Sequence, residues 1–269
     1  MKRRAERPPA KKVPALDGRS RQVLEALIQH HVLTAQPVGS ETIARNFGIG
    51  TSSATIRNVM ADLEEQGYLT HRHTSAGRLP TDRGYRVYVD TLKDVQRLSE
   101  QERERIEREY NAKRAELDDV LKGTSQLLAM LSNVAGVALR PTPAHAAPQR
   151  TELVVEGSSN VLNQPEFSDL GKVQALFRLI DEKRELSRAM AETIEEGAHV
   201  KVSIGAENRL PAIRECSLVT KTYAAGGRSV GVIGILGPMR MDYDKMVALV
   251  DHMAGVVSRS LREGTDRPA

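Results

Sequence analysis

Residues 37–69 read PVGSETIARNFGIGTSSATIRNVMADLEEQGYL, a pattern of two short helices joined by a glycine-bearing turn. Ser40 is predicted to cap the first helix. Gly48 and Gly50 supply the turn, because glycine adopts positive φ without a Cβ penalty. Gly67 stands where a helix commonly ends. The second helix has one apolar stripe at helical spacing, formed by Ile56, Val59, Met60 and Leu63. This is a helix-turn-helix arrangement, whose second helix enters the DNA major groove.

The face opposite that stripe carries small or hydrogen-bonding side chains, gathered toward the start of the second helix. Small residues let a backbone approach a groove closely, while Arg57 and Asn58 can pair with guanine and adenine edges. Ser52 and Ser53 are the natural capping residues. A solvated helix face with no ligand is the alternative interpretation. The predicted DNA-contacting residues are Thr51, Ser52, Ser53, Ala54, Thr55, Arg57, Asn58 and Ala61.

The segment that follows, residues 70–80, reads THRHTSAGRLP and indicates a strand, a polar turn and a return strand. A β-hairpin directly after a recognition helix is a wing, which contacts phosphates or the minor groove. Thr81 is predicted to cap a closing helix with Tyr85, Tyr88, Val89 and Leu92 on its inner side. The predicted wing contacts are His71, Arg72, His73, Ser75 and Arg78. Residues 16–94 are thus expected to form a winged helix-turn-helix domain.

Composition separates this first third from the rest of the chain. Residues 1–92 hold 14 Lys and Arg against 9 Asp and Glu, and the remaining residues hold 25 against 26. A basic module joined to a nearly neutral one is typical of a polyanion-binding domain with a regulatory or assembly domain. Residues 1–15, basic and proline-rich, are expected to be a disordered arm that either adds phosphate contacts or only aids solubility.

The remainder of the chain favours an α+β, mostly helical fold. Residues 95–140 are expected to contain one long connecting helix over 99–133, which either pairs with a second subunit or packs on its own C-terminal domain. Residues 141–151 hold several prolines and are interpreted as a linker. Strands are expected at 152–155 and 200–204, a hairpin at 216–236, and a final helix from about residue 242. Residues 152–269 are therefore predicted to form a small α+β domain.

No pattern in the sequence indicates catalysis, a metal or a cofactor. The single Cys216 excludes a disulfide framework and a multi-cysteine zinc site. His30 and His31 lack acidic or cysteine neighbours at ligand spacing and are interpreted as complements of a helix dipole. The sequence holds no phosphate-binding loop, nucleophile elbow or HExxH motif. It also lacks a membrane span or signal peptide, so a cytoplasmic protein is expected.

Several passages resemble the HrcA family of bacterial heat-inducible transcription repressors. They are AQPVGS at 35–40, SSATIRN at 52–58, MADLE at 60–64, SAGRLPT at 75–81, NVLNQPEF at 160–167 and IGILGPMRMDY at 233–243. The resemblance covers residues 17–140 and 152–262.

This resemblance implies a dimeric repressor that binds the inverted-repeat CIRCE operator upstream of the groE and dnaK genes. It also implies a GAF-like C-terminal domain, dependence on the GroEL chaperonin, and a location with the nucleoid. Family members carry a long stretch, including a dimerising subdomain, where this chain has only residues 141–150. The implied GAF-like domain is therefore shortened, and helix 99–133 with the residual α+β domain is predicted to take over dimerisation.

Two other functions fit the residues. The first is a winged-helix repressor that responds to a metabolite, and its mark would be a pocket with convergent polar groups. The second is a winged-helix adaptor for RNA or protein.

Overall fold

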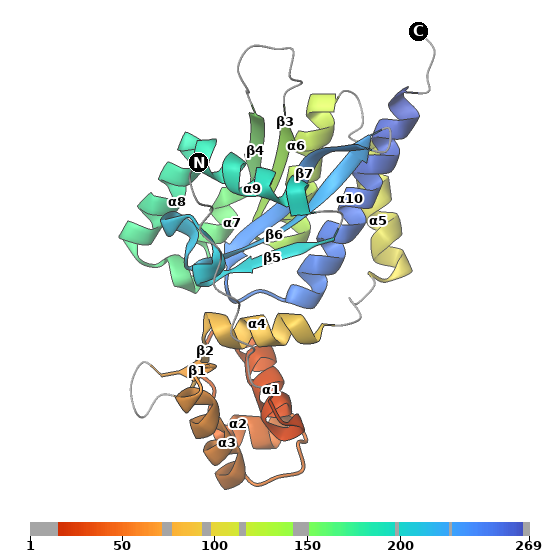
Figure 1. Ribbon diagram of the computed structural model, residues 1–269. Helices are drawn as coiled ribbons and strands as arrows, with labels where there is room; N and C mark the ends of the chain where they lie inside the picture. Colours follow the sequence, from red (N-terminus) through yellow and green to blue (C-terminus); the bar gives the residue numbers. More distant parts are fainter. Residues whose placement is uncertain are drawn as a thin grey trace, which may run out of the picture.

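The computed structural model describes residues 16–71, 77–92, 98–112, 117–141, 151–196, 199–225 and 228–265. A small helical unit at one end is joined to a larger sheet domain (Figure 1). The expected arm at residues 1–15 lies outside the described residues. The mixture of helices and antiparallel strands confirms the α+β class.

The helical unit comprises four helices and a two-stranded sheet. Asp17 caps the first helix, because its Oδ1 accepts a hydrogen bond from the Ser20 amide at 2.7 Å. Leu27, Ile43, Ile56 and Leu63 are fully buried and form the centre of its core. The elements are α1 Gly18–Thr34, α2 Ser40–Asn46, α3 Ser53–Glu65, β1 Leu69–Thr70, β2 Leu79–Pro80 and α4 Asp82–Thr91.

The sheet domain contains five antiparallel strands in the order β4-β3-β7-β6-β5. Its longest pair, β6 and β7, is the hairpin that the sequence predicted. A register shift between Tyr223 and Ala224 bends this pair near its turn. The strands are β3 Ala135–Pro141, β4 Thr151–Glu156, β5 Lys201–Ile204, β6 Cys216–Ala225 and β7 Arg228–Pro238.

Helices cover both faces of this sheet. Neighbouring residues of β6 show the two faces, because successive side chains of a strand point to opposite sides. Thr220 Oγ1 lies 3.1 Å from Thr193 Oγ1 on α9, whereas Lys221 pairs with Asp251 on α10. Helix α6 packs beside α10, and α5 lies outside these two (Figure 1). The helices are α5 Glu100–Ala112, α6 Leu117–Ser132, α7 Ser158–Leu162, α8 Leu170–Glu182, α9 Arg184–Glu196 and α10 Tyr243–Thr265. The short 3₁₀ turns are η1 Pro165–Phe167, η2 Gly205–Glu207 and η3 Pro211–Ile213.

The prediction of one long connecting helix over 99–133 is wrong. Two helices, α5 and α6, cover that range and contact each other. Asn133 adopts a left-handed conformation (φ 56°) that ends α6, and the chain continues directly into β3. Leu121 and Leu128 of α6 are buried in the chain's own domain. The alternative, packing within the chain, is therefore the one observed for these positions.

The expected linker at 141–151 also has a different role. β3 and β4 are antiparallel neighbours, with Pro141 opposite Thr151, so the segment between them connects two strands of one sheet. Residues 142–150 themselves lie outside the described residues. The sheet domain thus begins well before residue 152, because β3 lies between β4 and β7 and α6 covers it.

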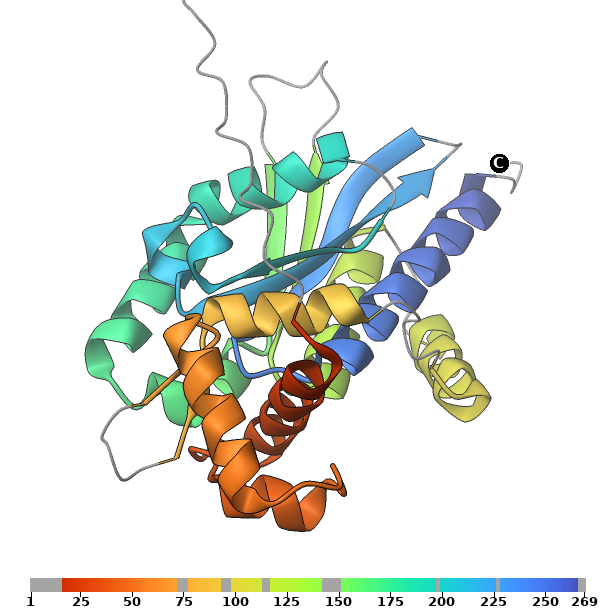
Figure 2. The same cartoon turned by 60° about the horizontal axis from the view of Figure 1, so that its bottom comes forward.

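Helix α4 forms the seam between the two parts of the molecule, lying across the underside of the sheet domain (Figure 2). Arg86 donates from Nε to Glu207 Oε1 at 2.7 Å and from an η nitrogen to the Val202 carbonyl at 2.6 Å. One turn earlier, Asp82 accepts a hydrogen bond from the Ala206 amide at 2.7 Å. These contacts fix how the helical unit is held against the sheet domain.

A second bridge crosses the seam at Arg240, whose side chain is only 12% exposed. It donates to the Val32 carbonyl near the end of α1 at 2.8 Å and pairs with Glu166 at 2.6 Å. His31 is buried beside this bridge, with Nδ1 2.9 Å from the Gln36 carbonyl. Burial lowers the pKa of His31, which favours its neutral form, so its predicted role as a dipole-complementing cation is wrong.

Candidate nucleic-acid interface

Helices α2 and α3 are joined by the turn that the glycines predicted. Gly48 and Gly50 both adopt positive φ, at 56° and 68°. The cap of α2 is Gly39, one residue before the predicted Ser40, which is instead buried in the first turn of the helix. This pair lies at the end of the molecule away from the five-stranded sheet (Figure 1).

Local interactions define both ends of α3. Ser52 is the N-cap, and its Oγ accepts a hydrogen bond from the Thr55 amide at 3.2 Å. At the other end Gly67 has φ 78°, and the Tyr68 amide bonds back to the Leu63 carbonyl at 2.8 Å. This is the left-handed termination expected of a glycine just beyond a helix. The helix α3 therefore begins at the predicted capping serines and ends just before the predicted Gly67.

The predicted DNA-contacting residues of α3 divide into two groups. Ser52, Ala54, Arg57, Asn58 and Ala61 are exposed. Thr51, Ser53 and Thr55 are half-buried, and Thr55 Oγ1 lies 3.0 Å from Ser52 Oγ within the cap. The cap thus occupies Ser52 and Thr55. The buried side carries Ile56, Met60 and Leu63 as predicted, with Val59 partly covered.

Arg57 and Asn58 project from α3 with no hydrogen bond or ion pair to any described residue. A guanidinium and an amide that are exposed and unpaired keep their full hydrogen-bonding capacity for a ligand. Ala54 and Ala61 lie on either side of these two residues along α3, and their short side chains leave the helix backbone open to close approach. The arrangement can present two base-reading side chains while the helix backbone lies close to a groove.

The expected wing is anchored by β1 and β2, with Thr70 opposite Leu79. A third backbone segment joins this small sheet, because the Val38 amide bonds to the Arg78 carbonyl at 2.9 Å and the Arg78 amide to the Val38 carbonyl at 2.8 Å. No pattern in the sequence predicted this pairing of Val38, which lies in the short segment between α1 and α2. Of the predicted wing contacts, Arg72, His73 and Ser75 lie outside the described residues.

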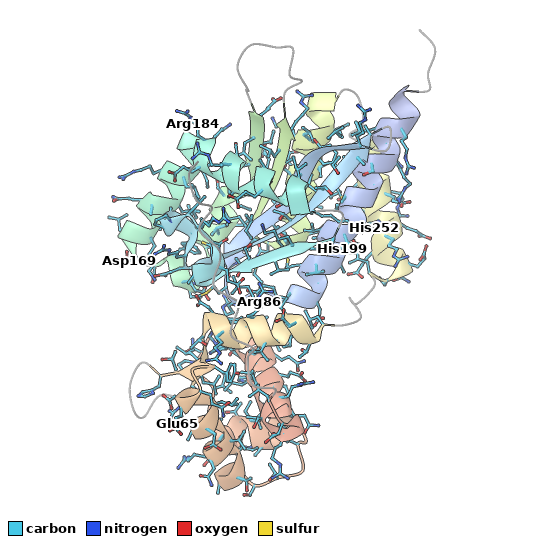
Figure 3. The ribbon with its side chains drawn as sticks, viewed as in Figure 1. Glu65, Arg86, Asp169, Arg184, His199 and His252 are labelled. Carbon is cyan, nitrogen blue, oxygen red and sulfur yellow. The ribbon has the colours of Figure 1, made fainter. Side chains whose placement is uncertain are left out.

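The two described wing residues have an acidic partner that the sequence analysis did not foresee. His71 Nδ1 contacts one oxygen of Glu64, and Arg78 Nε lies 2.6 Å from the other. Glu64 is near the C-terminal end of α3, beside the labelled Glu65 (Figure 3). In this arrangement His71 and Arg78 tie the hairpin to α3, and their contact with a phosphate backbone stays a prediction.

The cysteine of the sheet domain is not placed for nucleophilic chemistry. Cys216 is buried at the start of β6, and burial raises the pKa of its thiol to about 12. A thiol with that pKa stays protonated at neutral pH and is a poor nucleophile. Across the described parts of the chain, no group of three or more His, Cys, Asp or Glu is placed to hold a metal ion. None of the helices described has the length and apolar character needed to span a bilayer.

A tight-turn helix pair that exposes the polar face of its second helix, carried on a separate sheet domain, defines a helix-turn-helix DNA-binding protein. Comparison with known proteins specifies the class. Residues 144–247 match the family described as HrcA protein C terminal domain. The heat-inducible transcription repressor HrcA of Pelotomaculum thermopropionicum is 35% identical, covering 94% of this chain and 99% of that one. That of Moorella thermoacetica is 31% identical over 92% and 98% of the two chains.

The chain belongs to the HrcA family of heat-inducible transcription repressors, whose members are not enzymes. The alignment with the Moorella repressor extends over 341 residues, more than the 269 of this chain, so that relative carries residues with no counterpart here. A crystal structure described as that of a hypothetical protein at 2.2 Å resolution shares the fold, with a TM-score of 0.75 and 18% identity. It covers 93% of this chain and 99% of that one.

Proposed function

We propose that the chain is a homodimeric repressor of the chaperone operons groE and dnaK, acting in the cytoplasm at the nucleoid. It binds the inverted-repeat CIRCE operator through residues 16–94, which act as a winged helix-turn-helix domain. The observation that supports this most directly is the exposed, unpaired pair Arg57 and Asn58 on a capped helix beside a hairpin.

In the proposed complex, α3 of each protomer lies in the major groove of one half-site. Ala54 and Ala61 allow close approach, and Arg57 and Asn58 read base edges. Residues 72–76, with Arg72, His73 and Ser75, contact phosphates beside the groove. The basic residues 1–15 add further phosphate contacts.

The sheet domain serves as a GAF-like regulatory and dimerisation domain in this proposal. Because the large apolar side chains described for α5 and α6, apart from the exposed Met130, pack within the chain, self-association is assigned to the outer surface of the sheet domain. The repressor is kept active by the GroEL chaperonin and loses that support when heat stress occupies the chaperonin.

The base-reading role is tested by the preference for operator over random duplex DNA, measured by fluorescence anisotropy over a salt series. We expect Arg57→Ala or Asn58→Ala to reduce this preference by about 1–3 kcal/mol. Arg184→Ala is the matched control, because Arg184 is exposed at the opposite end of the molecule (Figure 3). An equal loss on both DNAs would assign Arg57 and Asn58 to backbone contacts only.

Three further measurements test the rest of the proposal. Sedimentation should show a dimer at micromolar concentration, and a monomer would contradict the assembly proposed here. The operator sequence presented as RNA should bind more weakly than the DNA duplex, since an RNA adaptor would show the reverse order. Adding GroEL should increase operator binding at elevated temperature.

A further inference from the structure

A cavity of about 320 Å³ lies at the seam between α4 and the sheet domain. Figure 3 labels Arg86 on α4 and His199 on the sheet-domain side of this seam. Val89 and Leu92 line the cavity from the helical unit. Its remaining walls belong to the sheet domain. Interfaces between domains are a preferred place for small-molecule sites, and this volume falls within their usual range.

The lining is mainly aliphatic. The apolar side chains from the sheet domain are Val200, Val202 and Val247. With the exception of Val247, the apolar lining residues from both sides are only partly buried. Their remaining exposed surface would be removed from water by an apolar ligand, which is favourable in proportion to the area covered. The cavity therefore suits a molecule with a short hydrocarbon portion.

The polar groups at the cavity differ in how their charges are balanced. Lys221 and Asp251 form an ion pair with each other. Asp244 has no such partner: its Oδ2 accepts a hydrogen bond from the Tyr88 hydroxyl at 3.1 Å, but no cation among the described residues pairs with it. Burial, with a contribution from nearby Asp242, raises the pKa of Asp244. A carboxylate in this setting gains from a cation placed beside it.

We propose that this cavity binds a small amphipathic amine, with its hydrocarbon chain against the valines and its ammonium group beside Asp244. The ligand would contact α4 and the sheet domain at once, so it would stabilise the orientation of the helical unit seen here. The bound ligand would lie next to the existing contacts of the seam, because Val202 lines the cavity and its carbonyl also accepts the hydrogen bond from Arg86. This inference concerns ligand binding and does not depend on the operator proposed above.

Three probes with the same hydrocarbon chain test the chemistry: hexylamine, hexanol and hexanoate. Binding to the full chain is followed by the amide chemical shifts of Val89, Val202 and Val247. We expect hexylamine to bind about fivefold more tightly than hexanol, the effect of one partly exposed charge contact, and hexanoate to bind most weakly.

Variants separate the charge contact from the apolar one. Asp244→Asn keeps an acceptor for Tyr88 and should make hexylamine and hexanol bind equally, while Asp62→Asn, on the exposed face of α3, should leave the difference intact. Val89→Phe fills the cavity from the partly exposed side and should abolish the shifts with all three probes. Equal affinity of all three probes for the unaltered chain would overturn the proposal. So would shifts that map to the polar groove beside α9, around Arg188 and Thr193.

Discussion

Replacing Gly205 with alanine tests whether the seam between α4 and the sheet domain depends on one close approach. Gly205 has φ 52°, and a Cβ built on it would lie 2.2 Å from Asp82 Oδ2. The left-handed conformation costs an alanine roughly 1–2 kcal/mol. Displacing Asp82 also removes its hydrogen bond to the Ala206 amide, which contributes about 1.5 kcal/mol. Gly205→Ala is therefore expected to lower the free energy of unfolding by roughly 2.5–3.5 kcal/mol.

Gly48→Ala is the matched control. Gly48 has a similar φ of 56°, but a Cβ there would meet no atom within 4 Å, so only the conformational cost applies. Urea unfolding followed by far-ultraviolet circular dichroism measures both variants. In an Asp82→Ala background, the cost of Gly205→Ala should fall toward that of Gly48→Ala, because the blocking carboxylate is gone and only the flexible end of Met239, with Sδ 2.7 Å from the added Cβ, must still shift. The reasoning is refuted if Gly205→Ala costs no more than Gly48→Ala, or if its cost is unchanged without Asp82.

Two further predictions concern the cap of α3 and the buried ionisable groups. Ser52→Ala should destabilise the protein by about 0.5–2 kcal/mol in thermal unfolding, whereas Ser53→Ala, which removes no described hydrogen bond, should not. Burial raises the pKa of Cys216 to about 12 and that of Tyr85 well above its ordinary value, so the folded state favours their neutral forms. The resulting stabilisation is complete below the ordinary pKa values and is lost as the pH rises from those values to the raised values of the folded state. The urea midpoint should therefore fall between pH 9 and pH 12. A flat midpoint over that range, or rapid alkylation of Cys216 in the folded protein, would contradict the burial argument.

The helix pair α2 and α3 was largely predictable from the sequence because short-range interactions define it. A capping hydroxyl at Ser52, an apolar stripe through Ile56 and Leu63, and a left-handed Gly67 all act within a few residues of α3. The hairpin of β6 and β7 was predictable for the same reason, since its strands adjoin one turn. Two of the passages that carry the family resemblance, SSATIRN at 52–58 and MADLE at 60–64, lie in α3 and its cap.

Tertiary contacts decided what local patterns left open. Glu64 pairs with His71 and Arg78 only because the hairpin folds back on α3. The partners of these three side chains could therefore not be assigned from the sequence. The apolar residues after Leu128 continue a helical spacing, yet Asn133 ends the helix and β3 enters the sheet between two strands that come later in the chain.

The seam itself was not foreseeable from the sequence. Arg86 meets Glu207 across 121 residues, and Arg240 meets Val32 across 208. Such contacts leave no periodicity in the sequence, because their partners become neighbours only after both parts have folded. The sequence by itself determined which helix has the cap, the apolar stripe and the exposed polar face of a recognition helix, and the tertiary structure decided how that helix is held.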